Sequence, residues 1–229
     1  MAFPRLVKAF FKTRPNRFLV LAEVRGKLVR VASADPGRLR ELLLPGRELR
    51  LIPATTPGRK TSYTLALVRH AGVWVSLIPA LANQIFEGAL ARQGVPGVRG
   101  RVLEREVSRE GSRFDFLVGV NGRRVLTEVK SATLVVSGRA YFPDAPTARG
   151  ARHVRELTRH VRLGGHSLLV FLVQRSDAHD LTPHAANDPI LAAALKEAQR
   201  AGVTIRAYRC DVGPTGCTLL GRIPYKSPE

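Results

Sequence analysis

Residues 112–130 read SRFDFLVGVNGRRVLTEVK, and this stretch decides the fold expected for the second part of the chain. Two strand-forming runs lie on either side of Asn121-Gly122, the dipeptide most typical of a two-residue β-hairpin turn. With the turn centred on that dipeptide, the numbers of paired residues sum to 243. This register predicts that Asp115 lies directly opposite Glu128.

The predicted register gathers charged side chains on one face of the hairpin. Directly opposite residues have β-carbons about 4.5–5.5 Å apart, so the carboxylates of Asp115 and Glu128 would share one small volume. Lys130 projects from the same face as Glu128 because strand side chains alternate, and it is expected to pair with Arg113. Two adjacent carboxylates need compensation, which can be a raised pKa with one carboxyl protonated, the nearby cations, or a bound divalent cation.

The opposite face of the hairpin is expected to be apolar and to pack against a helix. Its members alternate with the charged residues along both predicted strands. They are Phe114, Phe116, Val118, Val125, Thr127 and Val129.

Outward from the hairpin, apolar periodicity alternates between helical and strand spacing, which is typical of an α/β domain. A helix is expected to start at Leu81 and to end near Gly94. Further helices are predicted over 149–163 and 189–201, and strands over 114–120, 125–129, 168–173 and 205–208. Residues 224–229 are expected to form a loose tail.

The first third of the chain contains five short strand-like runs separated by glycine and proline, at 18–24, 28–32, 49–52, 63–68 and 73–78. Five short strands predict a small barrel of the OB type, which binds nucleic acid on an open face. We therefore predict an OB-like nucleic-acid-binding domain over residues 1–80 and an α/β domain over residues 81–229. Tyr63 or Trp74 could stack on bases, although a core position is favoured for Trp74.

The charge balance points to an anionic partner. The chain has 37 Lys plus Arg against 18 Asp plus Glu, a net charge of +19. Residues 1–80 hold 15 basic and 4 acidic residues, and the remainder holds 22 and 14. Nucleic acid is the expected partner, since each neutralised phosphate releases counterions. Compositional bias is the alternative, because 30 of the 37 basic residues are arginine.

The sequence favours a cytoplasmic protein with no membrane association. Its longest uncharged stretch, residues 71–86, is shorter than the roughly 20 apolar residues that cross a bilayer. Two cysteines, Cys210 and Cys217, fit a reducing compartment and are interpreted as structural thiols. Phosphate-binding loops, dinucleotide fingerprints, nucleophile elbows and zinc spacings are missing, so the sequence does not support nucleotide, flavin or serine chemistry.

The order Asp115, then Glu128-Val129-Lys130, resembles the signature of the PD-(D/E)XK nuclease superfamily. The proline that usually precedes the aspartate is replaced here by Phe114. The order of helix, hairpin, helix and strand is similar to the αβββαβ core of that superfamily. The fold class implied by this resemblance is a restriction-endonuclease-like mixed α/β domain after the barrel.

Longer motifs resemble the sugar fermentation stimulation protein A (SfsA) family. They are Pro36-Gly37-Arg38-Leu39, Ser112 to Phe116, Glu128 to Leu134, Tyr141-Phe142-Pro143-Asp144-Ala145-Pro146-Thr147-Ala148-Arg149-Gly150, and Val173-Gln174-Arg175. The resemblance implies an OB-like domain joined to a nuclease-like domain, DNA binding, and a regulatory role in sugar use. The family usually shows histidine, cysteine and asparagine before its Pro-Gly turn, where this chain has Ala32, Ser33 and Asp35.

The nuclease resemblance implies roles for five side chains. Asp115 and Glu128 would hold Mg²⁺ or Mn²⁺, which prefer oxygen ligands, and Lys130 would orient the attacking water. Glu106 would add a ligand, and Gln174 would close the site. For Glu106, a solvated charge beside neighbouring arginines is the alternative.

Basic residues in these motifs and in the helix that follows are predicted nucleic-acid contacts. They are Arg38, Arg113 and Arg149, with the helical series Arg152, Arg155, Arg159 and Arg162, for which a plain solvated face is the alternative. His153 and His160 are expected to be peripheral. The expected partner is DNA, with single-stranded or structured DNA as candidates and RNA left open. A homodimer is a candidate assembly, because nuclease-fold proteins that cut duplexes often act as dimers.

Two functions follow from the sequence. The first is DNA binding with metal-dependent nuclease activity. The second is a DNA-binding regulator of sugar-utilisation genes that keeps the nuclease fold without cleaving. Regulators usually show a helix-turn-helix, and none is evident in the sequence.

Overall fold

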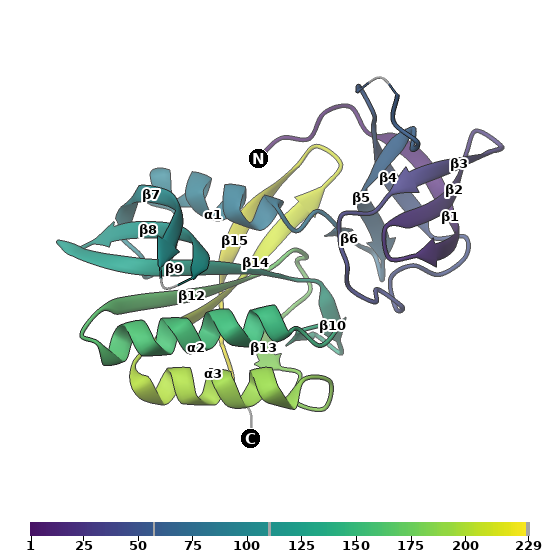
Figure 1. Cartoon of the computed structure of the whole chain (residues 1–229). Helices are drawn as coiled ribbons and strands as arrows, with labels where there is room; N and C mark the ends of the chain where they lie inside the picture. The colour runs from purple at the N-terminus through teal and green to yellow at the C-terminus, as the bar shows by residue number, and fades with distance from the viewer. Residues whose placement is uncertain (57, 110, 228–229) are drawn as a thin grey trace.

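The computed structural model describes residues 1–56, 58–109 and 111–227, and Figure 1 shows a β-barrel joined to a mixed α/β domain. Pro57, part of a predicted Pro-Gly break between strands, lies outside the described residues. The first domain contains β1 (Val7–Asn16), β2 (Leu19–Val24), β3 (Lys27–Ala32), β4 (Glu48–Pro53), β5 (Tyr63–His70) and β6 (Val73–Ser76).

The barrel is closed by five strands. The order is β3-β2-β1-β4-β5-β6, and a further parallel pairing of β3 with β5, at Val31 and Tyr63, closes β1 to β5 into a ring. This confirms the predicted OB-type barrel, but β6 is an addition to β5, and the fifth barrel strand is β1. Sequence periodicity misses β1 because only Ala9 and Phe11 are buried, and the exposed Phe10 between them breaks the alternation of polar and apolar residues.

Apolar side chains of the five strands and of the loop after β3 fill the barrel, among them Val20, Val31, Leu39, Leu49 and Leu65. Trp74 is 8% exposed and packs in a different cluster, which joins the barrel to the second domain. A core position for Trp74 is confirmed.

The second domain is built on one six-stranded sheet of order β15-β14-β12-β9-β8-β7. Its elements are α1 (Leu81–Ala91), β7 (Gly100–Arg109), β8 (Ser112–Val120), β9 (Arg123–Ala132), β10 (Leu134–Val136), β11 (Arg139–Phe142), α2 (Ala148–Arg162), β12 (His166–Val173), β13 (Asp180–Pro183), α3 (Pro189–Ala201), β14 (Thr204–Gly213) and β15 (Gly216–Ile223). The predicted helices and strands are all present. Strands β7, β10, β11, β13 and β15 were not predicted from the sequence.

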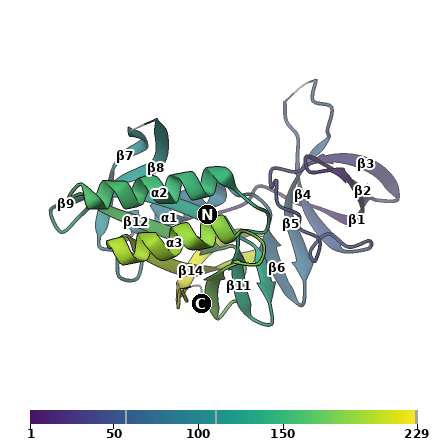
Figure 2. The same ribbon diagram turned by 60° about the horizontal axis from the view of Figure 1, so that its bottom comes forward.

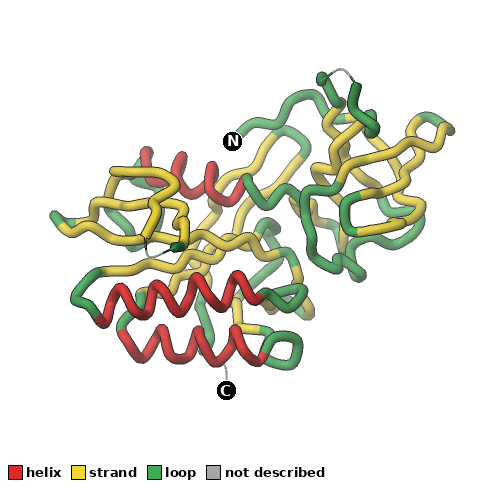
Figure 3. The backbone as a smooth tube through the Cα atoms, in the orientation of Figure 1, coloured by secondary structure: helices red, strands yellow, loops and turns green. Residues whose placement is uncertain are grey.

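Helices cover both faces of this sheet. Helix α1 lies on one face, and α2 and α3 lie side by side on the other, as Figures 1 and 2 show. The described helices all belong to the second domain (Figure 3). None of them is long and apolar enough to cross a bilayer.

The β8–β9 hairpin has the predicted register, with pairs from Val120 and Arg123 to Phe116 and Thr127, each summing to 243. The ladder ends there, so Asp115 and Glu128 lie just past the point where the strands part.

The expected pairing of Arg113 with Lys130 is wrong. Arg113 instead pairs with Ser108 of β7, and Lys130 pairs with Phe171 of β12. The strands diverge because each follows its other neighbour in the sheet.

The predicted apolar face is only partly correct. Phe116 and Val129 pack in the cluster that contains α1, and the rings of Phe116 and Phe86 lie 5.9 Å apart. Phe114 instead packs in the cluster that contains α2, 5.7 Å from the ring of His153. Phe114 and Phe116 therefore lie on opposite faces of the sheet, at the point where β8 separates from β9. Because helices cover both sheet faces, Glu128 is buried and Asp115 is partly buried.

Both ends of the described chain pair with the second domain. Ala2 forms a bridge with Gly216, and Tyr225 forms one with Leu181. The amide of Lys226 also donates to the carbonyl of Leu181. The expectation of a loose tail is therefore wrong for residues 224–226, and residues 228–229 lie outside the described part.

Candidate metal and nucleic-acid site

Asp115 is held at the end of the β8–β9 ladder by two donors. Its Oδ2 accepts a hydrogen bond of 2.8 Å from the amide of Val129, and its Oδ1 accepts one of 2.7 Å from Nδ2 of Asn83. Asn83 lies in the first turn of α1. Helix and hairpin thus fix the orientation of this carboxylate.

Glu128 is 3% exposed, and its two oxygens have different surroundings. Oε1 accepts hydrogen bonds from Nζ of Lys130 and, at 2.7 Å, from Nδ1 of His153. Oε2 is buried and has no hydrogen-bond partner among the described residues. The side chain therefore presents one saturated oxygen and one oxygen open to a further ligand.

The surroundings shift the pKa values of the two carboxyl groups in opposite directions. Burial raises the pKa of Asp115, and the nearby Glu128 carboxylate raises it further, against the hydrogen bonds from Val129 and Asn83. Burial also acts to raise the pKa of Glu128, but the hydrogen bonds from His153 and Lys130 outweigh it and leave the pKa below its ordinary value. Glu128 is the more readily ionised member of the pair.

His153 was expected to be peripheral, and this is wrong. It is 2% exposed and projects from α2 toward Glu128. The sequence contains a signal for this position, because His153 lies four residues before Leu157 and thus on the apolar face of the helix. Asn83 was also missed; a polar residue in a first helical turn gives no comparable signal.

Gln174 is fully buried beside the site rather than in it. Its Nε2 donates to Oγ of Ser131 at 2.7 Å and to the carbonyl of Ile78 at 3.1 Å. It thereby ties the end of β12 to the end of β9 and to the segment before α1. The geometry supports a positioning role for Gln174, because its partner Ser131 directly follows Lys130 in the chain.

The structure does not bring Glu106 to the carboxylate pair. Its side chain is 65% exposed and forms an ion pair of 2.7 Å with Arg113. This arrangement corresponds to the solvated-charge alternative, with Arg113 as the partner.

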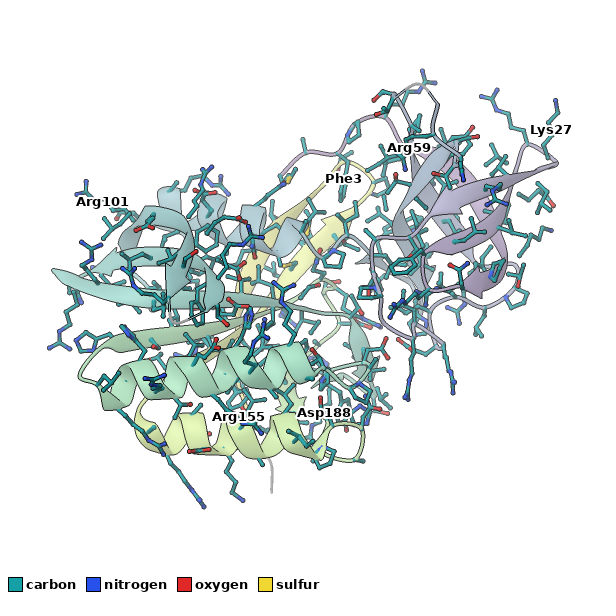
Figure 4. All side chains as sticks on the ribbon, viewed as in Figure 1. Phe3, Lys27, Arg59, Arg101, Arg155 and Asp188 are labelled. Carbon is teal, nitrogen blue, oxygen red and sulfur yellow. The ribbon has the colours of Figure 1, made fainter. Side chains whose placement is uncertain are left out.

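The predicted basic series lies on the solvent face of α2. The residues Arg149, Arg152, Arg155, Arg159 and Arg162 are all exposed. Arg152 approaches Glu156 at 3.9 Å, and Arg162 forms an ion pair of 2.9 Å with Glu197 of α3. Arg155 is labelled in Figure 4. One helix thus carries both the exposed arginines and the buried His153 that contacts Glu128.

The donor set is suited to a hard divalent cation. Asp115 and Glu128 supply carboxylate oxygens, one of them buried without a partner. No group of three or more His, Cys, Asp or Glu side chains forms a metal cluster within residues 1–56, 58–109 and 111–227. Two carboxylates are sufficient for Mg²⁺, which keeps several of its waters.

Comparison with known proteins places this architecture in a family. Residues 13–77 match the model of the SfsA N-terminal OB domain, and residues 80–216 match that of the sugar fermentation stimulation protein RE domain. The chain belongs to the sugar fermentation stimulation protein (SfsA) family.

Relatives in this family match nearly the whole chain. The sugar fermentation stimulation protein homolog of Moorella thermoacetica is 45% identical over 96% of this chain and 97% of its own length. The homolog of Chloroflexus aurantiacus is 41% identical over 96% and 85%. A solved structure of Pyrococcus furiosus SfsA in complex with Ca²⁺ has a TM-score of 0.90 at 30% identity and covers 99% of this chain and 98% of that one.

The SfsA motif at residues 141–150 joins the two domains and begins α2. Oδ2 of Asp144 accepts a hydrogen bond of 2.9 Å from the amide of Leu39 in the barrel. Thr147 caps α2 by accepting from the amide of Gly150 at 3.0 Å. Any other residue in place of Gly150 would collide with Thr147, because its Cβ would lie 2.7 Å from Cγ2 of Thr147. The motif therefore sets the start of the helix that carries His153.

The loop that departs from the SfsA pattern contacts the same motif. Asp35 is buried, and its Oδ1 accepts from the amide of Gly37 at 2.8 Å. Burial raises the pKa of Asp35, and the carboxylate of Asp144 adds to the rise against the Gly37 hydrogen bond. Arg38, in the next turn, donates to Oδ1 of Asn187 at 3.3 Å. In this structure, the loop docks the barrel onto the second domain.

Proposed function

We propose that this chain binds DNA and hydrolyses phosphodiester bonds with Mg²⁺ or Mn²⁺ held by Asp115 and Glu128. The observation that carries the proposal is the buried Oε2 of Glu128, which has no partner among the described residues although it belongs to the carboxyl group with the lowered pKa. The nuclease-like motif in which both residues lie supports the same assignment.

An unsatisfied oxygen on a buried ionised carboxylate is costly. Leaving such a group without a partner costs about 1–3 kcal/mol or more. A water alone would satisfy the hydrogen bond but would leave Asp115 and Glu128 repelling each other. A divalent cation shared by the two carboxylates removes both costs at once.

The side chains around the pair have separable roles. His153 holds Oε1 of Glu128 from α2, so Oε2 is the oxygen left for a further ligand. Lys130 donates to the same Oε1 from β9 and is only partly buried, so its ammonium can also face a bound phosphate. There it would hold the attacking water and stabilise negative charge that develops on the phosphoryl oxygens.

The cation, when bound, supplies Lewis-acid polarisation of the phosphate and lowers the pKa of water. The Pyrococcus furiosus relative, described as a complex with Ca²⁺, supports divalent-cation binding in this family. Ca²⁺, like Mg²⁺, selects oxygen ligands, which Asp115 and Glu128 provide.

The charge distribution supports nucleic acid as the substrate. The net charge is +19, and the exposed arginines of α2 lie on the same helix as His153. A row of arginines at helical spacing can follow a phosphate backbone, since each contact is electrostatic and independent of sequence. We also propose a cytoplasmic location, which the two free thiols Cys210 and Cys217 support.

A cleavage assay tests the proposal. Single-stranded DNA, double-stranded DNA and RNA are incubated with the full chain in Mg²⁺, Mn²⁺ or EDTA, and binding is followed in parallel at low salt. Lys130→Ala removes the amine, while Lys196→Ala on α3 serves as the matched control. We expect metal-dependent cleavage that EDTA and Lys130→Ala abolish and that Lys196→Ala leaves intact.

Binding without cleavage in any metal would overturn the nuclease assignment. It would favour the alternative, a DNA-binding regulator that keeps the nuclease fold without its activity.

A further inference from the structure

A groove of about 620 Å³ lies on the outer surface of the barrel, and its lining includes no residue of the second domain. Strand β1, the end of β2 and β4 form it, together with the segment that leads into β1. Its lining residues are Arg5, Leu6, Val7, Lys8, Phe10, Glu23, Arg25, Gly26 and Arg50.

The groove has a strong positive charge. Its lining holds four basic residues and one acidic residue. Two further charges border it, Lys12, which pairs with Glu23 at 2.7 Å, and Glu48, which pairs with Arg50 at 2.7 Å. Five cations against two carboxylates leave a net charge of +3. Arg5 and Arg25 form no ion pair with any residue in the described part of the chain, so both are available to an external anion.

An exposed aromatic ring lies among these cations. Phe10 is 39% exposed because β1 alternates, with Ala9 and Phe11 directed into the barrel and Phe10 directed outward. The ammonium of Lys8 lies 5.3 Å from the centre of the Phe10 ring. Arg50, which pairs with Lys8 across β1 and β4, lies 5.3 Å from the ring of Trp74. The groove thus presents one exposed aromatic ring, Phe10, among its basic side chains, while Arg50 at its edge also covers the buried Trp74.

We propose that this groove binds single-stranded nucleic acid, with one base stacked on Phe10 and the backbone phosphates paired with Arg5, Lys8, Arg25 and Arg50. The inference rests on the proposed nucleic-acid function and names the strandedness of the partner. An acidic peptide would match the charge but would not use the exposed ring. A duplex would match the charge too, but its base faces are already stacked and cannot cover Phe10.

Substitutions at Phe10 separate stacking from apolar contact. Binding of a labelled oligothymidylate of about 12 nucleotides and of a duplex is measured by fluorescence anisotropy with the full chain in EDTA, so that cleavage plays no part. We expect Phe10→Leu to weaken single-strand binding about 10-fold and duplex binding much less, while Phe10→Tyr retains affinity. Phe18→Leu is the matched control, because Phe18 is exposed on the barrel but outside the groove lining.

Charge is tested with two pairs of substitutions that change the net charge equally. Arg5→Ala with Arg25→Ala removes two phosphate partners, and the slope of log affinity against log salt should fall by about 1.4. The control pair, Arg101→Ala with Arg200→Ala, removes the same charge from β7 and α3 of the second domain, and Figure 4 labels Arg101. It should leave the slope nearly unchanged.

The outcomes distinguish this inference from the proposed function. If Phe10→Leu binds the oligothymidylate as tightly as the wild type, or weakens duplex binding equally, the groove assignment is overturned while metal-dependent cleavage can still stand. If the wild-type chain binds no nucleic acid at low salt, both are overturned.

Discussion

Nδ1 of His153 lies 2.7 Å from Oε1 of Glu128, and both side chains are buried between α2 and the end of β9. The two residues are 25 positions apart in sequence and come from different layers of the domain. This contact couples the placement of α2, and hence of its exposed arginines, to the orientation of the carboxylate pair.

Replacing His153 should weaken both stability and metal binding. The hydrogen bond lowers the pKa of Glu128, so it contributes stability above the ordinary pKa of glutamate, and that stability is lost as the pH falls through the lowered value. We expect His153→Ala to cost about 1.5–3 kcal/mol at pH 7, and much less in acid. Divalent-cation affinity should fall about 10- to 100-fold. Denaturant titrations at several pH values, with His166→Ala on the surface as the control, check this.

Replacing Asp115 by its neutral isostere should stabilise the metal-free chain. Burial and the charge of Glu128 raise the pKa of Asp115, so its ionisation opposes folding once the pH exceeds the unfolded-state pKa. Asp115→Asn should therefore raise the melting temperature in EDTA at pH 7. Asn83 can turn its amide to match the new partner.

The stabilising effect should disappear toward the pH at which Asp115 is protonated in the wild type. In excess Mn²⁺ the order should reverse, because only the wild type gains stability from the cation. A variant that is less stable than the wild type in EDTA at pH 7 would contradict the assignment of a strained carboxylate pair.

Asp144 should be important for docking of the two domains. Its Oδ2 accepts from the amide of Leu39, and removal leaves that donor unsatisfied. We expect Asp144→Ala to cost about 1–3 kcal/mol. Asp144→Asn, which retains an acceptor, should cost less. Limited proteolysis between the barrel and the second domain provides the measurement, and equal cleavage of Asp144→Ala and wild type would exclude this role.

Trp74, the single tryptophan of the chain, should report occupancy of the barrel groove. The guanidinium groups of Arg50 and Arg69 each lie 5.3 Å from its ring centre. A phosphate that pairs with Arg50 should move that group and change the tryptophan emission. Titration with single-stranded oligonucleotide in EDTA should give a saturable change that Arg50→Ala removes and Arg69→Ala, which lies outside the groove lining, retains.

The sequence predicts most of the second domain because local signals agree there. Asn121-Gly122 fixes the hairpin register, and the observed pairs confirm it as far as Phe116 and Thr127. The register could not show where the ladder ends, because β8 and β9 separate to follow β7 and β12, and those partners are distant in sequence. Local periodicity does not indicate which strands pair when they are far apart in the sequence.

The sequence predicted the charged residues of the candidate site but not the residues that support them. Asp115, Glu128 and Lys130 lie on two strands of one hairpin, so strand periodicity and the hairpin register predict that they are close together. Asn83 and His153 reach the pair from two helices on opposite faces of the sheet, so only the packed structure brings them together. Strand β1 was missed because Phe10, an apolar residue on the outward face between the buried Ala9 and Phe11, breaks the alternation of polar and apolar residues.

Calorimetric titration of Mn²⁺ into the wild-type chain and into Glu128→Gln will show whether Asp115 and Glu128 bind a divalent cation. Asp211→Asn is the control for an exposed carboxylate. We expect saturable binding to the wild type, retained in Asp211→Asn and lost in Glu128→Gln. Equal binding by the wild type and Glu128→Gln, or no binding by the wild type, would contradict it.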